Sequence, residues 1–301
     1  MKTGSNCKLH GVIPAIVTPL RPNGDVDEAL LRKQTEYLVS SGVNGLFVCG
    51  GTGEGAYLTT AEKKRVFEVI QETAAGRVFL CLAVINSNTR ATLAELEALS
   101  ICKPDFFVST PPYYHAMTQQ DILSHYAAVT AASTAPVILY NIQGRTGVNI
   151  APETIAYLFN NVENIVAVKE ASGNISQVAK IMQLTDGKID LYSGNDDQVV
   201  PILSLGGSGV ISVLSNVAPR KTHDMVQKFL DGDVAGSREI QLRALPLIDA
   251  LFCEVNPIPV KAALNLMGKE VGPLRLPLTE MEPQNQERLA KAMKDFGIKL
   301  A

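Results

Sequence analysis

One lysine follows directly on an apolar run, a place where a charged side chain is costly. The segment VAVKEASGN (166–174) starts with small or apolar residues and continues with Lys169, Glu170 and a Ser-Gly-Asn turn. Burial disfavours the ammonium form of a lysine relative to the neutral amine. A neutral amine can attack a ketone and form a Schiff base, which then serves as an electron sink. Lys169 is therefore a candidate nucleophile.

A simpler alternative is that Lys169 only pairs with Glu170 or with another carboxylate. Adjacent residues of a strand point to opposite faces, so Glu170 is a poor partner if the strand continues through it. Taken alone, the segment leaves both interpretations open.

Three further sites at the ends of apolar runs carry polar groups suited to a small organic acid. The segment GGTGE (50–54) offers backbone N–H groups and the Thr52 hydroxyl, which together can seat a carboxylate. Arg145 offers a planar fork for a second carboxylate. Tyr140 could carry protons to and from a bound ketone. The alternatives are an ordinary glycine turn, a solvated loop cation and a core tyrosine.

The elements that must position these residues follow from a repeated alternation of short apolar runs and amphipathic segments. Continuous apolar runs predict parallel strands buried on both faces. Repeated over 220 or so residues, this pattern favours an α/β protein of the (β/α)8 TIM barrel type, with its chemistry at the carboxyl ends of the strands. An open doubly wound sheet is the alternative, but the first run lacks the expected GxGxxG turn. The runs are GVIPAIVTPL, GLFVCGG, VFLCLAVI, DFFVSTP, PVILYNI, IVAVKEAS, IDLYSGND and GVISVLSN.

The alternation stops near Leu230, and only helical patterns follow, at about 234–253, 259–266 and 282–296. We therefore predict a barrel over residues 1–230 and a C-terminal helical extension over 231–301 that packs on the barrel.

Composition narrows the functional class. The 301 residues are 46% hydrophobic, and the net charge of −3 without a basic block argues against nucleic acid as the partner. The histidines lack metal-site spacing, and the odd number of cysteines without a CxxC pair argues against a disulfide framework. The N-terminus does not resemble a secretory signal, and no apolar run reaches the ~18 residues of a membrane span. We therefore predict a soluble cytoplasmic protein without a metal.

Several motifs resemble one known family in their order along the chain. The sequence is similar, nearly end to end, to the pyruvate-dependent class I lyases and synthases, which include dihydrodipicolinate synthase and N-acetylneuraminate lyase. The Arg-Thr-Gly step (145–147) and the C-terminal motifs resemble the dihydrodipicolinate synthase branch more closely. The motifs are GVIPAIVTPL, GGTGE, TPPYY, YNIQGRTG, VAVKEASGN, YSGND, GGSGVISV, NPIPVKAALNLMG and LRLPLTEM.

The resemblance implies a role for each candidate. Lys169 would form a Schiff base with pyruvate, which is bound covalently as a substrate, so no cofactor is expected. Tyr140 would shuttle protons. Thr52, with neighbouring backbone groups including Gly51, would hold the pyruvate carboxylate. Arg145 would bind the carboxylate of the second substrate, aspartate semialdehyde.

The resemblance also implies roles for Tyr114 and Ile211. Ile211 would line the pyruvate pocket through its backbone. Tyr114 would reach into the site of a partner subunit, because the family usually assembles as a homotetramer, a dimer of dimers.

Three departures from the family pattern concern the second substrate and regulation. Gly51 replaces a threonine that usually joins a proton relay between two tyrosines, so the relay would need water or another residue. Gln143 replaces a usual proline. The segment AVINSNT (83–89) replaces an AGTG-like segment near the lysine feedback site.

Two other functions therefore stand beside the synthase. One is a different pyruvate Schiff-base aldolase or dehydratase, acting on a 2-keto-3-deoxy sugar acid or N-acetylneuraminate. The other is a non-catalytic ligand-binding paralogue.

Overall fold

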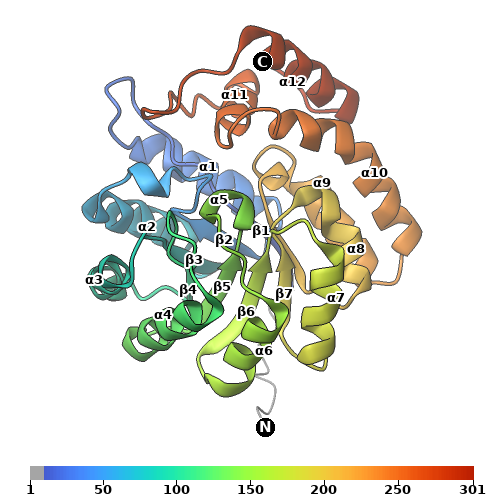
Figure 1. Cartoon of the computed structure of the whole chain (residues 1–301). Coiled ribbons are helices and arrows are strands. Elements are labelled where there is room, and N and C mark those ends of the chain that lie inside the picture. The colour runs from blue at the N-terminus through green and yellow to red at the C-terminus, as the bar shows by residue number, and fades with distance from the viewer. Residues whose placement is uncertain (1–9) are drawn as a thin grey trace. The chain divides into compact units, whose positions relative to one another are not determined.

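The computed structural model describes residues 10–301, and the N-terminal residues on which the prediction of no secretory signal rests lie outside this range. Eight strands, with helices between them, are hydrogen-bonded in the order β1-β8-β7-β6-β5-β4-β3-β2. They form a nearly closed barrel of parallel strands, which confirms the predicted (β/α)8 fold (Figure 1). The strands are β1 (Gly11–Pro14), β2 (Gly45–Val48), β3 (Phe79–Val84), β4 (Phe106–Ser109), β5 (Val137–Asn141), β6 (Ile165–Glu170), β7 (Asp190–Ser193) and β8 (Gly209–Ser212).

Helices occupy the connections and the C-terminal region. The α-helices are α1 (Glu28–Ser40), α2 (Thr60–Ala74), α3 (Thr89–Leu99), α4 (Gln119–Ala132), α5 (Gln143–Thr146), α6 (Pro152–Asn161), α7 (Ile175–Leu184), α8 (Val199–Ser204), α9 (Pro219–Leu230), α10 (Val234–Leu251), α11 (Ile258–Leu266) and α12 (Pro283–Phe296). Short 3-10 turns are η1 (Gly55–Tyr57), η2 (Ser100–Cys102), η3 (Asp196–Gln198) and η4 (Leu214–Asn216). Among residues 10–301, no helix is long and apolar enough to cross a membrane.

Local sequence explains where several elements begin. Thr59 and Glu62 form a reciprocal capping box that starts α2. Pro152 occupies the first turn of α6, where a missing backbone N–H costs nothing. All five residues of β5 are buried, as expected for a strand covered on both faces.

The chain forms two compact units. The first comprises the described residues up to Gly11 together with Leu80–Ile211. Its strands β5, β6 and β7 place Tyr140, Lys169 and Tyr192 at one level, in register with one another. Outside these strands, apolar side chains of α4, α6 and α7 pack in one buried cluster with Leu139 and Val168. This cluster holds the strands that carry the candidate nucleophile.

The second unit comprises Val12–Phe79 and Ser212–Ala301. Helices α10, α11 and α12, near the C-terminus in Figure 1, match the predicted helical extension closely. Their apolar faces form one buried cluster with Val17, which follows β1, and with Leu214 and Val217. The predicted division at residue 230 stays a prediction.

Candidate functional site

The predicted site residues fall into two groups. Lys169, Tyr140, Tyr114, Arg145 and Ile211 belong to the first unit, and Gly51 and Thr52 belong to the second.

Lys169 and Tyr140 lie side by side at the carboxyl ends of neighbouring strands. The Lys169 side chain ends 4.1 Å from the centroid of the Tyr140 ring, measured from Nζ. Both residues are buried, with exposed fractions of 4% and 8%. A buried amine thus lies within reach of a phenol in the part of a barrel where active sites are built.

Tyr192 completes this row on the other side of Lys169, and the sequence analysis missed it. It pairs with Lys169 in the strand register and is fully buried. The strand IDLYSGND was recognised, but only the register between strands shows which of its residues stands beside the lysine.

Glu170 has three hydrogen-bond donors other than Lys169. Its carboxylate accepts hydrogen bonds from Asn141 Nδ2 at 2.9 Å, from Gln177 Nε2 at 3.1 Å and from the Ser172 backbone N–H at 2.7 Å. All three donors are neutral. This agrees with the alternation of side chains along a strand: Lys169 lies against Tyr140, whereas Glu170 is bonded to Asn141.

Arg145 lies on the one-turn helix α5, which the sequence analysis treated as loop. The Thr146 hydroxyl ties this turn to its flanks, because its Oγ1 lies 3.0 Å from the carbonyl oxygens of both Ile142 and Val148 and its single O–H can donate to either. The Arg145 side chain is exposed. It is therefore held at its base and accessible to a ligand.

Tyr114 and Ile211 have contrasting environments. Tyr114 is 87% exposed and has a backbone φ of 85°, which is uncommon for a bulky residue. Its ring packs edge-on against His115, with centroids 5.0 Å apart. Ile211 lies in β8 and is 1% exposed. A tyrosine presented outward in this way is suited to contact a partner.

In the second unit, the GGTGE segment forms a tight turn after β2. Thr52 is buried, and its hydroxyl oxygen accepts from Asn256 Nδ2 at 3.0 Å, a partner that the sequence analysis missed. Within residues 10–301, the backbone N–H groups of Gly51 and Thr52 have no recorded acceptor. A Cβ on Gly55 would lie 1.7 Å from the Cys49 carbonyl oxygen, so this turn requires glycine there.

A buried ion pair supports the same turn. Lys261 Nζ lies 2.7 Å from Glu54 Oε1, and it also donates to the carbonyls of Thr18 and Pro273. The second Glu54 oxygen accepts from the Arg275 backbone N–H at 2.9 Å. Burial lowers the pKa of Lys261, although Glu54 opposes this effect. Because every Lys261 N–H has an acceptor, this lysine holds structure rather than offering an amine.

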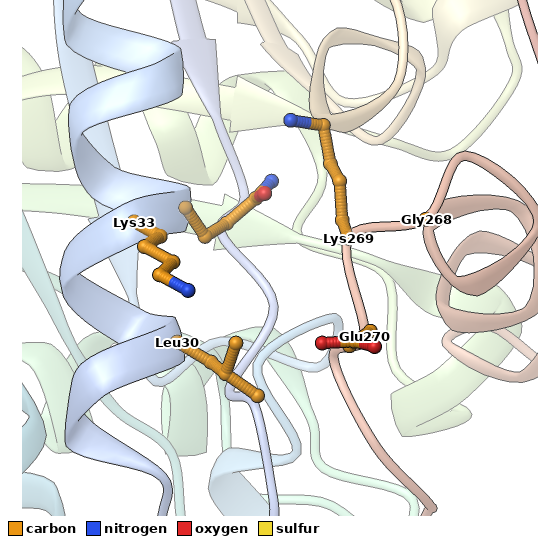
Figure 2. A pocket seen from close by; sticks show the side chains of 6 residues that line it. Leu30, Lys33, Gly268, Lys269 and Glu270 are labelled. Atoms are coloured by element: carbon orange, nitrogen blue, oxygen red, sulfur yellow. The ribbon is translucent and has the colours of Figure 1, made fainter. Parts of the chain in front are cut away.

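A cavity of about 200 Å³ also lies in the second unit, between α1 and the segment after α11 (Figure 2). Figure 2 shows the Lys33 and Glu270 side chains reaching toward each other across it. Lys269 extends along its edge to the Tyr37 ring, with Nζ 3.3 Å from the ring centroid. None of the predicted site residues lines this cavity.

The fold and the strand-end residues define a (β/α)8 barrel in which a buried lysine and tyrosine end neighbouring strands. The chain belongs to the dihydrodipicolinate synthetase family, whose model matches residues 8–296.

Individual relatives agree with this assignment. The chain is 46% identical over 284 residues to a 4-hydroxy-tetrahydrodipicolinate synthase of Lachnoclostridium phytofermentans, covering 94% of this chain and 97% of that protein. The solved dihydrodipicolinate synthase of Cyanidioschyzon merolae with lysine bound is similar, with a TM-score of 0.94, 37% identity, and 97% and 99% of the two chains covered. The chloride-inhibited enzyme of Acinetobacter baumannii complexed with pyruvate has a TM-score of 0.93, 34% identity, and coverage of 97% and 100%. The predicted family and the prediction of an enzyme are confirmed.

Proposed function

We propose that this chain is a 4-hydroxy-tetrahydrodipicolinate synthase, which condenses pyruvate with aspartate semialdehyde through a Schiff base on Lys169. The observation that carries the proposal is the buried pair of Lys169 and Tyr140 on adjacent strand ends, with Nζ 4.1 Å from the ring centroid. The names of relatives that are 41–46% identical over nearly the whole chain support the same activity.

The proposed chemistry needs one amine and one proton carrier. Lys169 Nζ attacks the pyruvate keto carbon, and loss of water gives the imine. Removal of a proton from the pyruvate methyl gives an enamine, whose carbon attacks the aldehyde, and the aldehyde oxygen takes up a proton. The amino group of aspartate semialdehyde then attacks the imine carbon and displaces Lys169 Nζ, which regenerates the free amine. The Tyr140 hydroxyl carries protons in these steps. Pyruvate is thus bound covalently as a substrate, and no separate cofactor is needed.

Recognition of the two acids is assigned to the surrounding groups. Backbone N–H groups of Gly51 and Thr52 would hold the pyruvate carboxylate, because they have no recorded acceptor within residues 10–301. Ile211 would line the pyruvate pocket. Arg145, exposed on its anchored turn, would bind the carboxylate of the aldehyde substrate.

The proposed assembly is a homotetramer in which Tyr114 enters the site of a partner subunit. The outward position and unusual backbone angle of Tyr114 support this role. The predicted cytoplasmic location stays a prediction.

Reductive trapping tests the proposal directly. Borohydride added with pyruvate should leave a reduced three-carbon adduct on Lys169, identified by peptide mass spectrometry, and turnover with aspartate semialdehyde should accompany it. Lys169→Met should lose both signals. An adduct on Lys261 with Lys169 unmodified would contradict the assignment.

A second candidate is cleavage of a 2-keto-3-deoxy sugar acid or of N-acetylneuraminate. One observation favours it: apart from Gly51 and its two chain neighbours, no atom of residues 10–301 lies within 4 Å of a Cβ built on Gly51, so this position leaves space for a bulkier substrate. A turnover screen of aldehyde acceptors and keto sugar acids separates the two activities, and no turnover in any assay would favour a non-catalytic paralogue.

A further inference from the structure

Directly beyond the Tyr140 and Lys169 pair, the same two strands carry a second pair whose side chains point to the other face. Asn141 and Glu170 are in register with each other, one residue after Tyr140 and Lys169. Asn141 is fully buried and Glu170 is 1% exposed. Asn141 Nδ2 donates to Glu170 Oε2 at 2.9 Å. A side-chain bond therefore joins β5 and β6 immediately behind the proposed reacting groups.

Asn141 also closes the segment that carries Arg145. Its Oδ1 accepts from the Ile150 backbone N–H at 3.0 Å, and its Nδ2 donates to Asn149 Oδ1 at 2.8 Å. The segment 142–149, which carries Arg145, therefore begins next to Asn141 and is hydrogen-bonded to the Asn141 side chain again where it ends.

Gln177, from α7, completes the network. Its Nε2 donates to Glu170 Oε2 and to Asn149 Oδ1, both at 3.1 Å, and its Oε1 accepts from Asn149 Nδ2 at 2.9 Å. Every polar atom of the four side chains has a partner. A fully satisfied buried network of this kind favours one arrangement over its alternatives.

Two backbone donors fix which side-chain atoms of the network donate and which accept. The Ser172 N–H requires an acceptor on residue 170, and the Ile150 N–H requires an acceptor on residue 141. An ionised Glu170 accepts at both oxygens, whereas a glutamine must turn an NH₂ group toward one of the existing donors. Rotation of the Asn141 amide does not help, because it would set Nδ2 against the Ile150 N–H.

We propose that Glu170 and Asn141 are positioning residues that hold Lys169 against Tyr140 and anchor the Arg145 segment to the same strands. This inference rests on the proposed function, because it assigns roles relative to Lys169, Tyr140 and Arg145. Neither residue needs to touch a substrate.

Glu170→Gln is the first test. We expect kcat to fall on the order of 10- to 100-fold, since misplacement by about 1 Å can cost ~10²-fold. Glu153→Gln is the matched control, because Glu153 is an exposed carboxylate on α6 of the same unit and should leave turnover unchanged.

Rescue by reversal distinguishes positioning from general damage. In the double variant Asn141→Asp with Glu170→Gln, residue 170 donates to residue 141, while both backbone donors keep their acceptors. The Asn149 and Gln177 amides can turn over, so every bond between the four side chains is restored with opposite polarity. The double variant should recover most of the activity that Glu170→Gln loses. A double variant no more active than Glu170→Gln would overturn the proposal.

The two parts of the network, the bond that holds Lys169 and the bonds that anchor the Arg145 segment, should affect different kinetic constants. Asn149→Ala removes the side-chain bonds of the Arg145 segment to Asn141 Nδ2 and to Gln177. It leaves the Ile150 N–H bonded to Asn141 and the bond between Asn141 and Glu170 intact. We expect a raised KM for the aldehyde substrate with wild-type borohydride trapping of pyruvate. Impaired trapping in Asn149→Ala with an unchanged aldehyde KM would contradict this division of roles.

A readout that does not require catalysis keeps the inference apart from the proposed function. Competitive labelling of amines, followed by peptide mass spectrometry, reports the reactivity of Lys169 and its pH profile in the folded protein, checked by circular dichroism. Glu170→Gln should change both, the double variant should restore both, and Glu153→Gln should change neither. If the wild-type protein traps no pyruvate, the proposed function fails, while labelling still tests the positioning role of Glu170 and Asn141. Labelling of Lys169 that is identical in the wild-type protein and the three variants overturns that role.

Discussion

At the scale of single residues, one substitution should distinguish the role of Tyr140 from that of Lys169. Tyr140→Phe keeps the ring beside Lys169 but removes the hydroxyl. Turnover should fall by about 10²–10⁴-fold, the usual contribution of a general acid or base, while borohydride trapping at Lys169 persists. Steady-state kinetics and trapping on the same preparation measure the difference. A loss of less than about tenfold would remove Tyr140 from the proton-carrying role.

Gly51 discriminates between the two candidate substrates. Beyond its own chain neighbours, a Cβ at this position has no atom of the described residues within 4 Å, so Gly51→Thr should be accommodated. In a synthase the added hydroxyl should maintain or raise turnover with aspartate semialdehyde. In an enzyme for a keto sugar acid, the side chain would occupy substrate space and lower turnover. Parallel assays of both activities decide, with Gly51→Ala as the control for added bulk without a hydroxyl.

His125 predicts a pH dependence of stability. Its burial on α4 lowers its pKa to about 4 from 6.5, and Nδ1 lies 3.0 Å from the Thr89 hydroxyl. Between these pH values, His125 binds more protons in the unfolded state than in the folded state. The free energy of unfolding that depends on neutral His125 is therefore fully present above pH 6.5 and is lost as pH falls toward 4. Urea denaturation at a series of pH values should show this loss. His125→Phe should flatten it, whereas replacing the exposed His10 by Gln should not.

At the scale of elements, the bond between α11 and the GGTGE turn has a measurable cost of removal. Lys261→Met leaves the Glu54 carboxylate buried without its cation, and breaking a buried pair typically costs about 3–5 kcal/mol. The urea midpoint should fall markedly, and adding Glu54→Gln should restore part of it. Lys291→Met removes an exposed pair on α12 and should have little effect. Equal effects of the two lysine substitutions would contradict this account.

The sequence predicts elements more fully than it predicts their cross-connections. Periodicity located the strands and the C-terminal helices because burial on one face or on both leaves a local pattern. The turn α5 was missed because four residues are too few to show a helical period. Glu54 and Lys261, which are 207 residues apart, carry no local sign of their pairing. Likewise, the candidate Lys169 was found from its apolar setting, but Tyr192 and the Asn141–Glu170 bond depend on strand register.

At the scale of the whole molecule, the proposed assembly makes a complementation prediction. If Tyr114 serves a partner's site, mixed oligomers of Lys169→Met and Tyr114→Phe subunits contain sites in which both residues are intact. Subunits unfolded and refolded together should then regain turnover that neither variant shows alone. Sedimentation velocity on each sample should show the same oligomer. Activity of the mixture equal to the mean of the separate variants would place Tyr114 outside the partner's site.

Because the ribosome makes the chain from the N-terminus, the two units are completed at different times during synthesis. The first unit is nearly continuous, from Leu80 to Ile211, whereas the second joins Val12–Phe79 to Ser212–Ala301. The segment holding Glu54 therefore emerges early and must wait for Lys261 before its carboxylate can be buried with a counter-ion. Nascent chains arrested shortly before α11 should protect the first unit from protease while residues 12–79 remain susceptible, and release of the full chain should protect both.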